Sequence, residues 1–335
     1  MNSDIASPRV LYIAGSGRSG TTLLERVVGT APGYEPVGEL IDLARRVAAE
    51  NELCGCSQSF ADCPFWQAVG RRLAAQPGTR WRDPAWSPQN LDRLLELQRM
   101  LARQRYLPRL LIGPRSASVR TALHEYGQRY RQLYSAIAAH AGADVVVDAS
   151  KWPSQALALF RAGVDVRVLH VVRDVRGVAN SLSKEDVVRP QSQGDATMYS
   201  QSVASGAGRW LATQTEVDLL RTVGMKVHRL SYDDFVDAPA TSLRGSLEAL
   251  GLASPDFQAV AEPAGGRPTV HLEPSHGLSG NPSRFRHGDT TLRADDSWRT
   301  RLSPGQQRMA VAVALPQVVR GTLPQAIRSI AGRAR

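Results

Sequence analysis

The stretch from Ile13 to Leu24 constrains the fold of this chain more than any other part of the sequence. Val10 to Ala14 is a short apolar run typical of a buried strand, Gly15 to Gly20 is rich in glycine, and Thr21 to Val28 has the pattern of a helix start. In such a strand, loop and helix unit, the N–H groups of the loop converge and the helix adds the positive end of its dipole. The unit therefore predicts an anion site, and phosphate is the anion we expect.

The loop has the glycine spacing of the phosphate loop of nucleoside triphosphatases but lacks its lysine, because Thr21 stands at that position. The cation is Arg18 instead, whose guanidinium can hold two oxygens of a bound anhydride. The run Arg18-Ser-Gly-Thr-Thr22 resembles the 5′-phosphosulfate loop of the sulfotransferases, which use 3′-phosphoadenosine-5′-phosphosulfate (PAPS). The resemblance implies that PAPS is bound by Gly17, Arg18, Ser19, Gly20, Thr21 and Thr22. A glycine turn with a chance arginine is the alternative interpretation.

A second phosphate site is predicted where the apolar run Val166 to Val172 ends in Arg173. Ser181 follows eight residues later in a predicted helix, so its hydroxyl and the Arg173 guanidinium can face one anion above the sheet. This arrangement resembles the sulfotransferase 3′-phosphate motif and implies that Arg173 and Ser181 bind the 3′-phosphate of PAPS. Alternatively, Arg173 and Asp174 form a salt-bridged corner and Ser181 is incidental.

The same resemblance implies three catalytic residues. Lys151 follows the predicted strand Val145 to Val147, where related sulfotransferases carry a lysine directed at the transferring sulfuryl group. The histidine that many cytosolic members have two residues later is absent, because Pro153 occupies its position. Glu39 matches the Gly-Glu pair of bacterial and Golgi-type relatives and would act as the base, with Arg18 and Lys151 stabilising the developing charge. Alternatively, Glu39 only favours a helix start.

Near the carboxyl end, Ser279 to Gly288 and Trp298 to Ser303 resemble the segment that closes over the cofactor in this family. The match is partial, because His287 replaces a lysine and the tryptophan lies farther along the chain. Arg284 and Arg286 are both candidates to bind the 3′-phosphate.

The remaining patterns alternate apolar runs with amphipathic segments, which indicates βαβ units around a parallel sheet. We expect helices near residues 39–47, 88–101, 119–137, 153–161, 175–183, 200–222, 240–250 and 303–319, a strand at 227–230, and a long loop over 265–289. The predicted fold is α/β: a three-layer domain of the P-loop NTPase type, with a largely parallel sheet and helical insertions. Residues 1–335 would form a single sulfotransferase domain, with a helical insertion over 67–142 and a cofactor-closing loop and C-terminal segment over 265–303.

The chain of 335 residues has a net charge of +10, carried mostly by arginine, because lysine occurs only at Lys151, Lys184 and Lys226. Such charge is either a solvated basic surface or an attraction for polyanions. No signal-like N-terminal stretch and no apolar run of ~18 residues is present, so we expect a cytoplasmic protein with no membrane span.

The three cysteines, Cys54, Cys56 and Cys63, lie within ten residues and lack a fourth nearby Cys or His. Reduced structural thiols without a metal are therefore expected, although a distant histidine could still complete a tetrahedral site.

The sequence thus predicts a PAPS-dependent sulfotransferase that acts on a hydroxyl or amine of a small-molecule, glycan, lipid or peptide acceptor. Nucleic acid is not an expected partner, and the acceptor and the oligomeric state stay open. Two other classes fit some of the features. A P-loop kinase or NTPase would need a lysine before Thr22 and magnesium. A non-catalytic nucleotide-binding or nucleic-acid-binding protein would need neither Glu39 nor Lys151.

Overall fold

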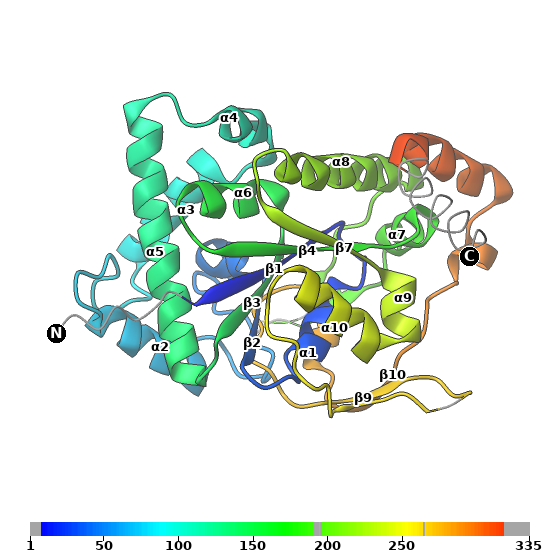
Figure 1. The fold of residues 1–335 in the computed structure, drawn as a ribbon, viewed down its shortest axis with the longest axis horizontal. Coiled ribbons are helices and arrows are strands. Elements are labelled where there is room, and N and C mark those ends of the chain that lie inside the picture. Colours follow the sequence, from blue (N-terminus) through cyan, green and yellow to red (C-terminus); the bar gives the residue numbers. More distant parts are fainter. Residues whose placement is uncertain (1–7, 191–193, 195, 264, 318–335) are drawn as a thin grey trace, which may run out of the picture.

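The central element of the fold is a five-stranded parallel sheet in the order β2-β3-β1-β4-β7. The computed structural model describes residues 8–190, 194, 196–263 and 265–317 (Figure 1). The five strands are β1 Arg9–Gly15, β2 Tyr34–Gly38, β3 Val145–Lys151, β4 Val166–Val172 and β7 Lys226–Ser231. Because these strands are parallel, their carboxyl ends meet at one edge, and ligands of such sheets bind there.

Strand β1 lies in the middle of the sheet and is apolar on both faces. Val10, Tyr12 and Ala14 face one hydrophobic core, whereas Leu11 and Ile13 face the other. All five side chains are fully buried. A near-continuous apolar run is what a strand covered on both sides requires, and it explains why β1 and β4 could be recognised in the sequence.

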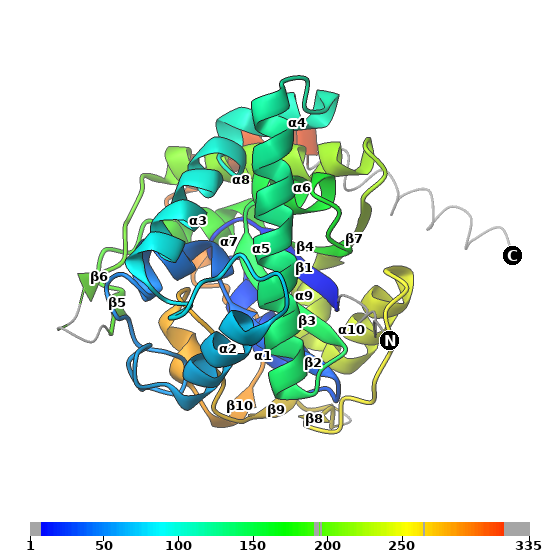
Figure 2. The same cartoon turned by 90° about the vertical axis from the view of Figure 1, so that its left-hand side faces the viewer.

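Helices cover both faces of the sheet (Figures 1 and 2). One face is covered by α3 Pro88–Leu101, α5 Ala117–Ala141, α6 Pro153–Arg161 and α8 Val203–Arg221, and the other by α1 Thr21–Val28, α9 Tyr232–Asp237 and α10 Pro239–Ala249. The predicted α/β class, with a parallel sheet between helical layers and a glycine loop between β1 and α1, is confirmed.

The other helices and strands lie outside the central sheet, and the short strands form two small sheets of their own. They are α2 Pro64–Ala75, α4 Leu107–Ile112, α7 Val175–Leu182 and α11 Trp298–Arg301, the short pair β5 Val188–Arg189 and β6 Ala196–Thr197, and β8 Val260–Ala261, β9 Thr269–Leu272 and β10 Gly288–Thr291. A helix also runs over residues 304–317, and the last two residues of the predicted 303–319 helix lie outside the described residues. No described helix is both long enough and apolar enough to cross a membrane.

The prediction of a long loop over 265–289 is wrong. This region contains β9, a 3-10 turn Pro282–Phe285 and the start of β10. Strands β9 and β10 pair with each other, and with β8 they form a small antiparallel sheet of order β10-β9-β8. Val270 and Leu272 alternate with polar residues and are buried in the core beside α1. A strand of four residues, whose partner lies sixteen residues away, leaves too short a pattern to detect.

The prediction of a helix over 39–47 is correct only in part. Glu39 has φ −96° and ψ 81° and is not helical, and a 3-10 turn Leu40–Asp42 and a π-helix Leu43–Val47 follow it. Strand β2, which precedes Glu39, was not predicted, because Pro36 and Gly38 make the segment resemble a loop. Proline is tolerated more easily here because β2 is an edge strand of the five-stranded sheet and pairs within it only with β3.

Candidate functional site

A cavity of about 860 Å³ lies at the carboxyl ends of the parallel strands. It is lined by the loop after β1, by Glu39 after β2, by Lys151 at the end of β3 and by Arg173 after β4. Its charged lining is mostly basic, with eight cations and two carboxylates: Arg18, Arg26, Arg46, Lys151, Arg173, Arg209, Arg286 and Arg293 against Glu39 and Asp42. The cavity therefore favours an anionic ligand.

The glycine loop forms the floor of the predicted anion site. Gly20, at the start of α1, has φ +86°, and a Cβ there would lie 2.4 Å from the Tyr232 ring, so only glycine fits. Ser16 lines the cavity, and its buried Oγ has no hydrogen-bond partner among the described residues. Buried hydroxyl groups are normally hydrogen-bonded, and a phosphate oxygen bound in the loop would give this one an acceptor.

Strained backbone is concentrated around this cavity. Of the described residues, five that are not glycine have positive φ, and three of these five line the cavity: Arg18 at 69°, Lys151 at 70° and Ser279 at 57°. Such conformations cost about 1–3 kcal/mol each and persist where the surroundings enforce them, typically at functional sites. The observation agrees with functional roles for Arg18 and Lys151.

Glu39 and Lys151 come together from the ends of two neighbouring strands. Lys151 Nζ donates a hydrogen bond to Glu39 Oε1, and the two side chains are only 15% and 14% exposed. The backbone of Glu39 is held separately, because its N–H donates to Leu278 O at 2.7 Å. The structure thus pairs a carboxylate with an ammonium group in the lining of the cavity.

A buried carboxyl, Asp148, holds the end of β3 near the Glu39–Lys151 pair. Asp148 accepts hydrogen bonds from Tyr134 Oη at 2.7 Å and from the Ser150 N–H at 2.9 Å. Ser150 Oγ in turn accepts from the Ile41 N–H at 3.0 Å, which ties the end of β3 to the turn after Glu39. Burial raises the pKa of Asp148 to about 6, with its hydrogen bonds acting in the opposite direction.

A second buried carboxyl supports β2 from the side of α1. Glu25 is fully buried and accepts a hydrogen bond from the Gly38 N–H, directly before Glu39. Burial raises the pKa of Glu25 to about 8, although the Gly38 N–H and Lys151 act to lower it. Neither buried acid lines the cavity, so both position its wall rather than contact a ligand.

Arg173 connects three parts of the site. Its Nη1 donates to Arg18 O at 3.1 Å, and its Nη2 donates to Asp295 O at 2.8 Å and lies 3.3 Å from the Asp295 carboxylate. Its guanidinium also lies over the Tyr232 ring, 4.9 Å from the centroid. Ser181, in α7, lines the same cavity, and its contact with a 3′-phosphate stays a prediction.

The two candidate arginines of the C-terminal segment lie in different places. Arg286 lines the cavity, whereas Arg284 does not. Arg284 is buried, and its guanidinium donates to Gly280 O at 3.3 Å and to Leu53 O at 3.2 Å. Ser19 is also fully buried and does not line the cavity, although Gly17, Arg18, Gly20, Thr21 and Thr22 do. Contact of Arg284 or Ser19 with a ligand stays a prediction, and only Arg286 of the two arginines faces the cavity.

Several lining residues were not predicted from the sequence. Arg209 comes from the middle of α8, Tyr232 follows β7, and Arg293 comes from the segment after β10. Tyr232 had a usable signal, since it follows the end of a predicted strand as Arg173 does. Arg209 and Arg293 had no such signal. Arg209 is one of many helix arginines, and Arg293 lies in a segment without secondary structure, so nothing in the sequence marks either as a residue of the cavity.

The chain belongs to the sulfotransferase family, whose model matches residues 9–256. The match spans the glycine loop, the Glu39–Lys151 pair, Arg173 and Ser181. The search of curated proteins finds no match.

Three solved structures illustrate the likeness. The sulfotransferase domain of the Synechococcus PCC 7002 olefin synthase is 18% identical, with 95% of this chain and 98% of that chain covered and a TM-score of 0.47. The sulfotransferase domain from the curacin biosynthetic pathway is 13% identical, with 91% and 96% covered and a TM-score of 0.46. Sulfotransferase STF1 from Mycobacterium tuberculosis H37Rv is 18% identical, with 76% and 70% covered and a TM-score of 0.39. Membership of the family rests on the match over residues 9–256.

Proposed function

We propose that this sulfotransferase moves a sulfuryl group from PAPS to a hydroxyl or amine of an acceptor by in-line displacement. One observation carries the proposal: a single basic cavity contains the glycine loop with Arg18, the Arg173 and Ser181 pair, and the Glu39–Lys151 ion pair. Its volume of about 860 Å³ is within the usual range of small-molecule sites, which is about 300–1,000 Å³.

The nucleotide would be held at its two phosphorylated ends. Gly17, Arg18 and Gly20 to Thr22 would bind the 5′-phosphosulfate, through N–H groups of the loop and the positive end of α1. Arg173, Ser181 and Arg286 would bind the 3′-phosphate. The excess of cations over carboxylates in the lining supports a ligand with several negative charges.

In the proposed step, the acceptor oxygen or nitrogen attacks sulfur while the bond from sulfur to the bridging phosphate oxygen breaks. Glu39 takes the proton of the acceptor, and 3′-phosphoadenosine-5′-phosphate leaves with the bridging oxygen. Arg18 and Lys151 would stabilise the charge on the leaving oxygen and the sulfuryl oxygens.

The ion pair suggests how donor binding and the base are connected. The Lys151 ammonium donates to Glu39 Oε1 and so contacts the carboxylate that would act as the base. The phosphosulfate would offer Lys151 a second anionic partner, and Glu39 would then be free to accept a proton. We propose that donor binding thus prepares the base in the same cavity.

A kinase would handle its phosphates differently. It needs a magnesium-binding carboxylate near the phosphates. Of the two carboxylates that line the cavity within the described residues, Glu39 binds Lys151 and Asp42 binds Arg45 at 2.7 Å. Turnover is therefore expected without added magnesium. A cytoplasmic location, a single domain over residues 1–335, the acceptor type and the absence of a nucleic-acid partner stay predictions.

The test uses PAPS labelled in the sulfuryl group, incubated with the 335-residue chain and panels of alcohol, phenol, sugar and amine acceptors. We expect labelled product by mass spectrometry, with or without added magnesium. ATP that phosphorylates the same acceptors only with magnesium, together with no transfer from PAPS, would support a kinase instead.

Nucleotide preference tests the 3′-phosphate assignment. The product 3′-phosphoadenosine-5′-phosphate should raise the melting temperature well above the effect of ADP, because only the former offers a phosphate to Arg173 and Ser181. Arg173→Ala should remove most of this preference. Equal shifts with both nucleotides in the unmutated protein would contradict the assignment.

A further inference from the structure

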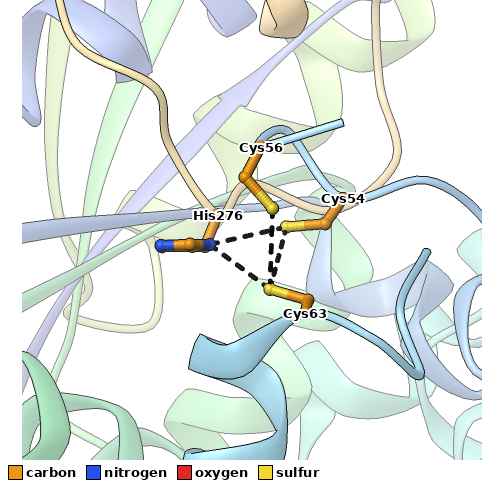
Figure 3. A group of neighbouring side chains, drawn as sticks. All are labelled: Cys54, Cys56, Cys63 and His276. Carbon is orange, nitrogen blue, oxygen red and sulfur yellow. Dashed lines mark hydrogen bonds between the residues drawn. The ribbon is translucent and has the colours of Figure 1, made fainter. Parts of the chain in front are cut away.

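Four potential metal ligands converge outside the catalytic cavity. Cys54, Cys56 and Cys63 lie in the segment before and at the start of α2, and His276 reaches them from a segment 213 residues beyond Cys63 (Figure 3). The ligand atoms of all four lie within 4.8 Å of one another. The cysteine spacing alone lacked a fourth ligand, and the fold supplies one.

The distances between the ligand atoms match a tetrahedral zinc site. With Zn–S bonds of about 2.3 Å and a Zn–N bond of about 2.0–2.1 Å, a tetrahedron separates its sulfur atoms by about 3.8 Å and sulfur from nitrogen by about 3.6 Å. Cys63 Sγ lies 3.6 Å from Cys54 Sγ and 3.7 Å from Cys56 Sγ. His276 Nδ1 lies 3.3 Å from Cys63 Sγ and 3.8 Å from Cys54 Sγ. A disulfide would bring two sulfur atoms to about 2.05 Å, and all three cysteines are free.

The surrounding structure holds Cys54, Cys56 and His276 in place. A turn that closes with Ser57 N–H donating to Cys54 O at 2.8 Å brings Cys54 and Cys56 together. The His276 ring stacks on Phe65 with centroids 4.6 Å apart and planes 7° apart. Its carbonyl accepts a hydrogen bond from Trp66 Nε1 at 2.9 Å. Such outer contacts orient ligands in metal sites.

We propose that Cys54, Cys56, Cys63 and His276 bind one Zn²⁺ in a structural site. Four protein ligands leave no open position for water or substrate, so the ion would not take part in catalysis. On binding, the thiols release their protons to solvent, and three thiolates with Zn²⁺ and a neutral imidazole carry a net charge of −1. The buried guanidinium of Arg284, which donates to Leu53 O directly before Cys54 at 3.2 Å, would offset this charge.

The position of the site indicates which parts of the chain a bound ion would hold together. Beside it, Gly55 N–H donates to Gly277 O at 3.0 Å. Two residues after His276, Leu278 N–H donates to Val37 O at 2.9 Å and Leu278 O accepts from Glu39 N–H at 2.7 Å. The ion would therefore fasten the cysteine segment to the backbone that holds Glu39. This last step rests on the proposed function, whereas zinc binding does not.

Metal content tests the proposal directly. The 335-residue chain, purified under reducing conditions without chelators, should contain about one zinc per molecule by inductively coupled plasma mass spectrometry. Cys56→Ser and His276→Gln should each lower zinc content at least about fivefold. His140→Gln is the matched control, because His140 contacts the same Phe65 ring, with centroids 5.1 Å apart, but is not a ligand. It should keep its zinc.

Cobalt gives a readout that needs no variant. Co²⁺ added to metal-free, reduced protein should produce the visible d–d bands of a tetrahedral thiolate site, and Zn²⁺ should abolish them. No zinc in the purified protein and no cobalt bands on reconstitution would overturn the proposal, as would full zinc content in Cys56→Ser and His276→Gln. These outcomes do not involve PAPS, so they are independent of sulfuryl transfer.

Discussion

At the scale of single residues, two contacts hold Glu39 and a third holds the residue before it. Lys151 binds its carboxylate, Leu278 O accepts its backbone N–H, and Glu25 accepts the N–H of the preceding Gly38. Glu39 stands directly before the 3-10 turn Leu40–Asp42, but its side chain makes no capping hydrogen bond there. The carboxylate binds Lys151 instead, which a residue that only started a helix would not need. The contacts fix a carboxylate after the end of β2, in the lining of the cavity that the glycine loop also lines.

Glu39→Gln should therefore abolish most turnover. The amide keeps the size and can still accept a hydrogen bond from Lys151, but it cannot take a proton from the acceptor. We expect kcat to fall by roughly two orders of magnitude or more, measured with labelled PAPS at saturating acceptor. Affinity for 3′-phosphoadenosine-5′-phosphate should not fall, because the glutamine no longer competes as an anion with the nucleotide for Lys151.

The matched control for this substitution is Glu35→Gln, in the same strand but outside the cavity lining. It should turn over within a few-fold of the parent. If Glu39→Gln also stays within a few-fold, the base lies elsewhere, and the Glu39–Lys151 pair serves only to hold two strand ends together.

The sequence was sufficient to find the residues that follow strand ends. Arg173 and Lys151 each follow an apolar run, and parallel strands bring their carboxyl ends to one edge, so nearness in space could be inferred from order in sequence. His276 could not be paired with the cysteines in this way. His276 reaches the cysteines from the segment after β9, and no local sequence pattern indicates where such a segment lies in the folded protein.

At the scale of elements, β2 depends on a close backbone contact with the C-terminal segment. Gly38 has φ +76°, and a Cβ there would lie 2.2 Å from both the N and the O of Leu278. These two atoms make the backbone hydrogen bonds from Leu278 to Val37 and Glu39, so neither can move without loss of those hydrogen bonds. The first residue of the Gly-Glu pair is thus a steric requirement, whereas the role of Glu39 as the base stays a proposal.

Gly38→Ala should destabilise the protein by at least about 1–3 kcal/mol, the usual cost of forcing a side chain into a strained backbone position. Chemical denaturation measures the change. Gly208→Ala is the control, because Gly208 lies within α8 and an added Cβ there meets nothing within 4 Å. It should be neutral or stabilising by up to about 1 kcal/mol. Equal stability of Gly38→Ala and the parent would show that Leu278 does not hold this strand.

Elements with a full hydrophobic period were predicted well, and those built on contacts were not. Helix α6 and strand β4 have the predicted bounds, because each shows its period within its own residues. Strands β2 and β9 are short and owe their form to partners far along the chain. Their existence follows from tertiary packing, which a single sequence does not display.

At the scale of the whole molecule, the two cores on either side of the sheet enclose ionisable groups close to the site. Glu25 on α1 and Asp148 on β3 are both at least 97% buried, and burial raises the pKa of each. Their hydrogen bonds keep Gly38 and Ser150 in place. The stability of the fold is therefore linked to pH through groups that hold the cavity wall.

Glu25→Gln should remove a large part of that pH dependence. The pKa of Glu25 is about 8 in the folded protein and near 4.5 in the unfolded chain, so the folded state binds the additional proton between these values. The stability that this proton provides is complete below about pH 4.5, is lost as pH rises, by up to about 1.4 kcal/mol per unit, and is gone above about pH 8. Glutamine keeps an acceptor for the Gly38 N–H but cannot titrate. Urea denaturation at several pH values between about 5 and 8 should therefore show the variant gaining on the parent as pH rises. Parallel curves for the two proteins would mean that Glu25 ionises at an ordinary pKa and that its bond to Gly38 is made by a carboxylate throughout this range.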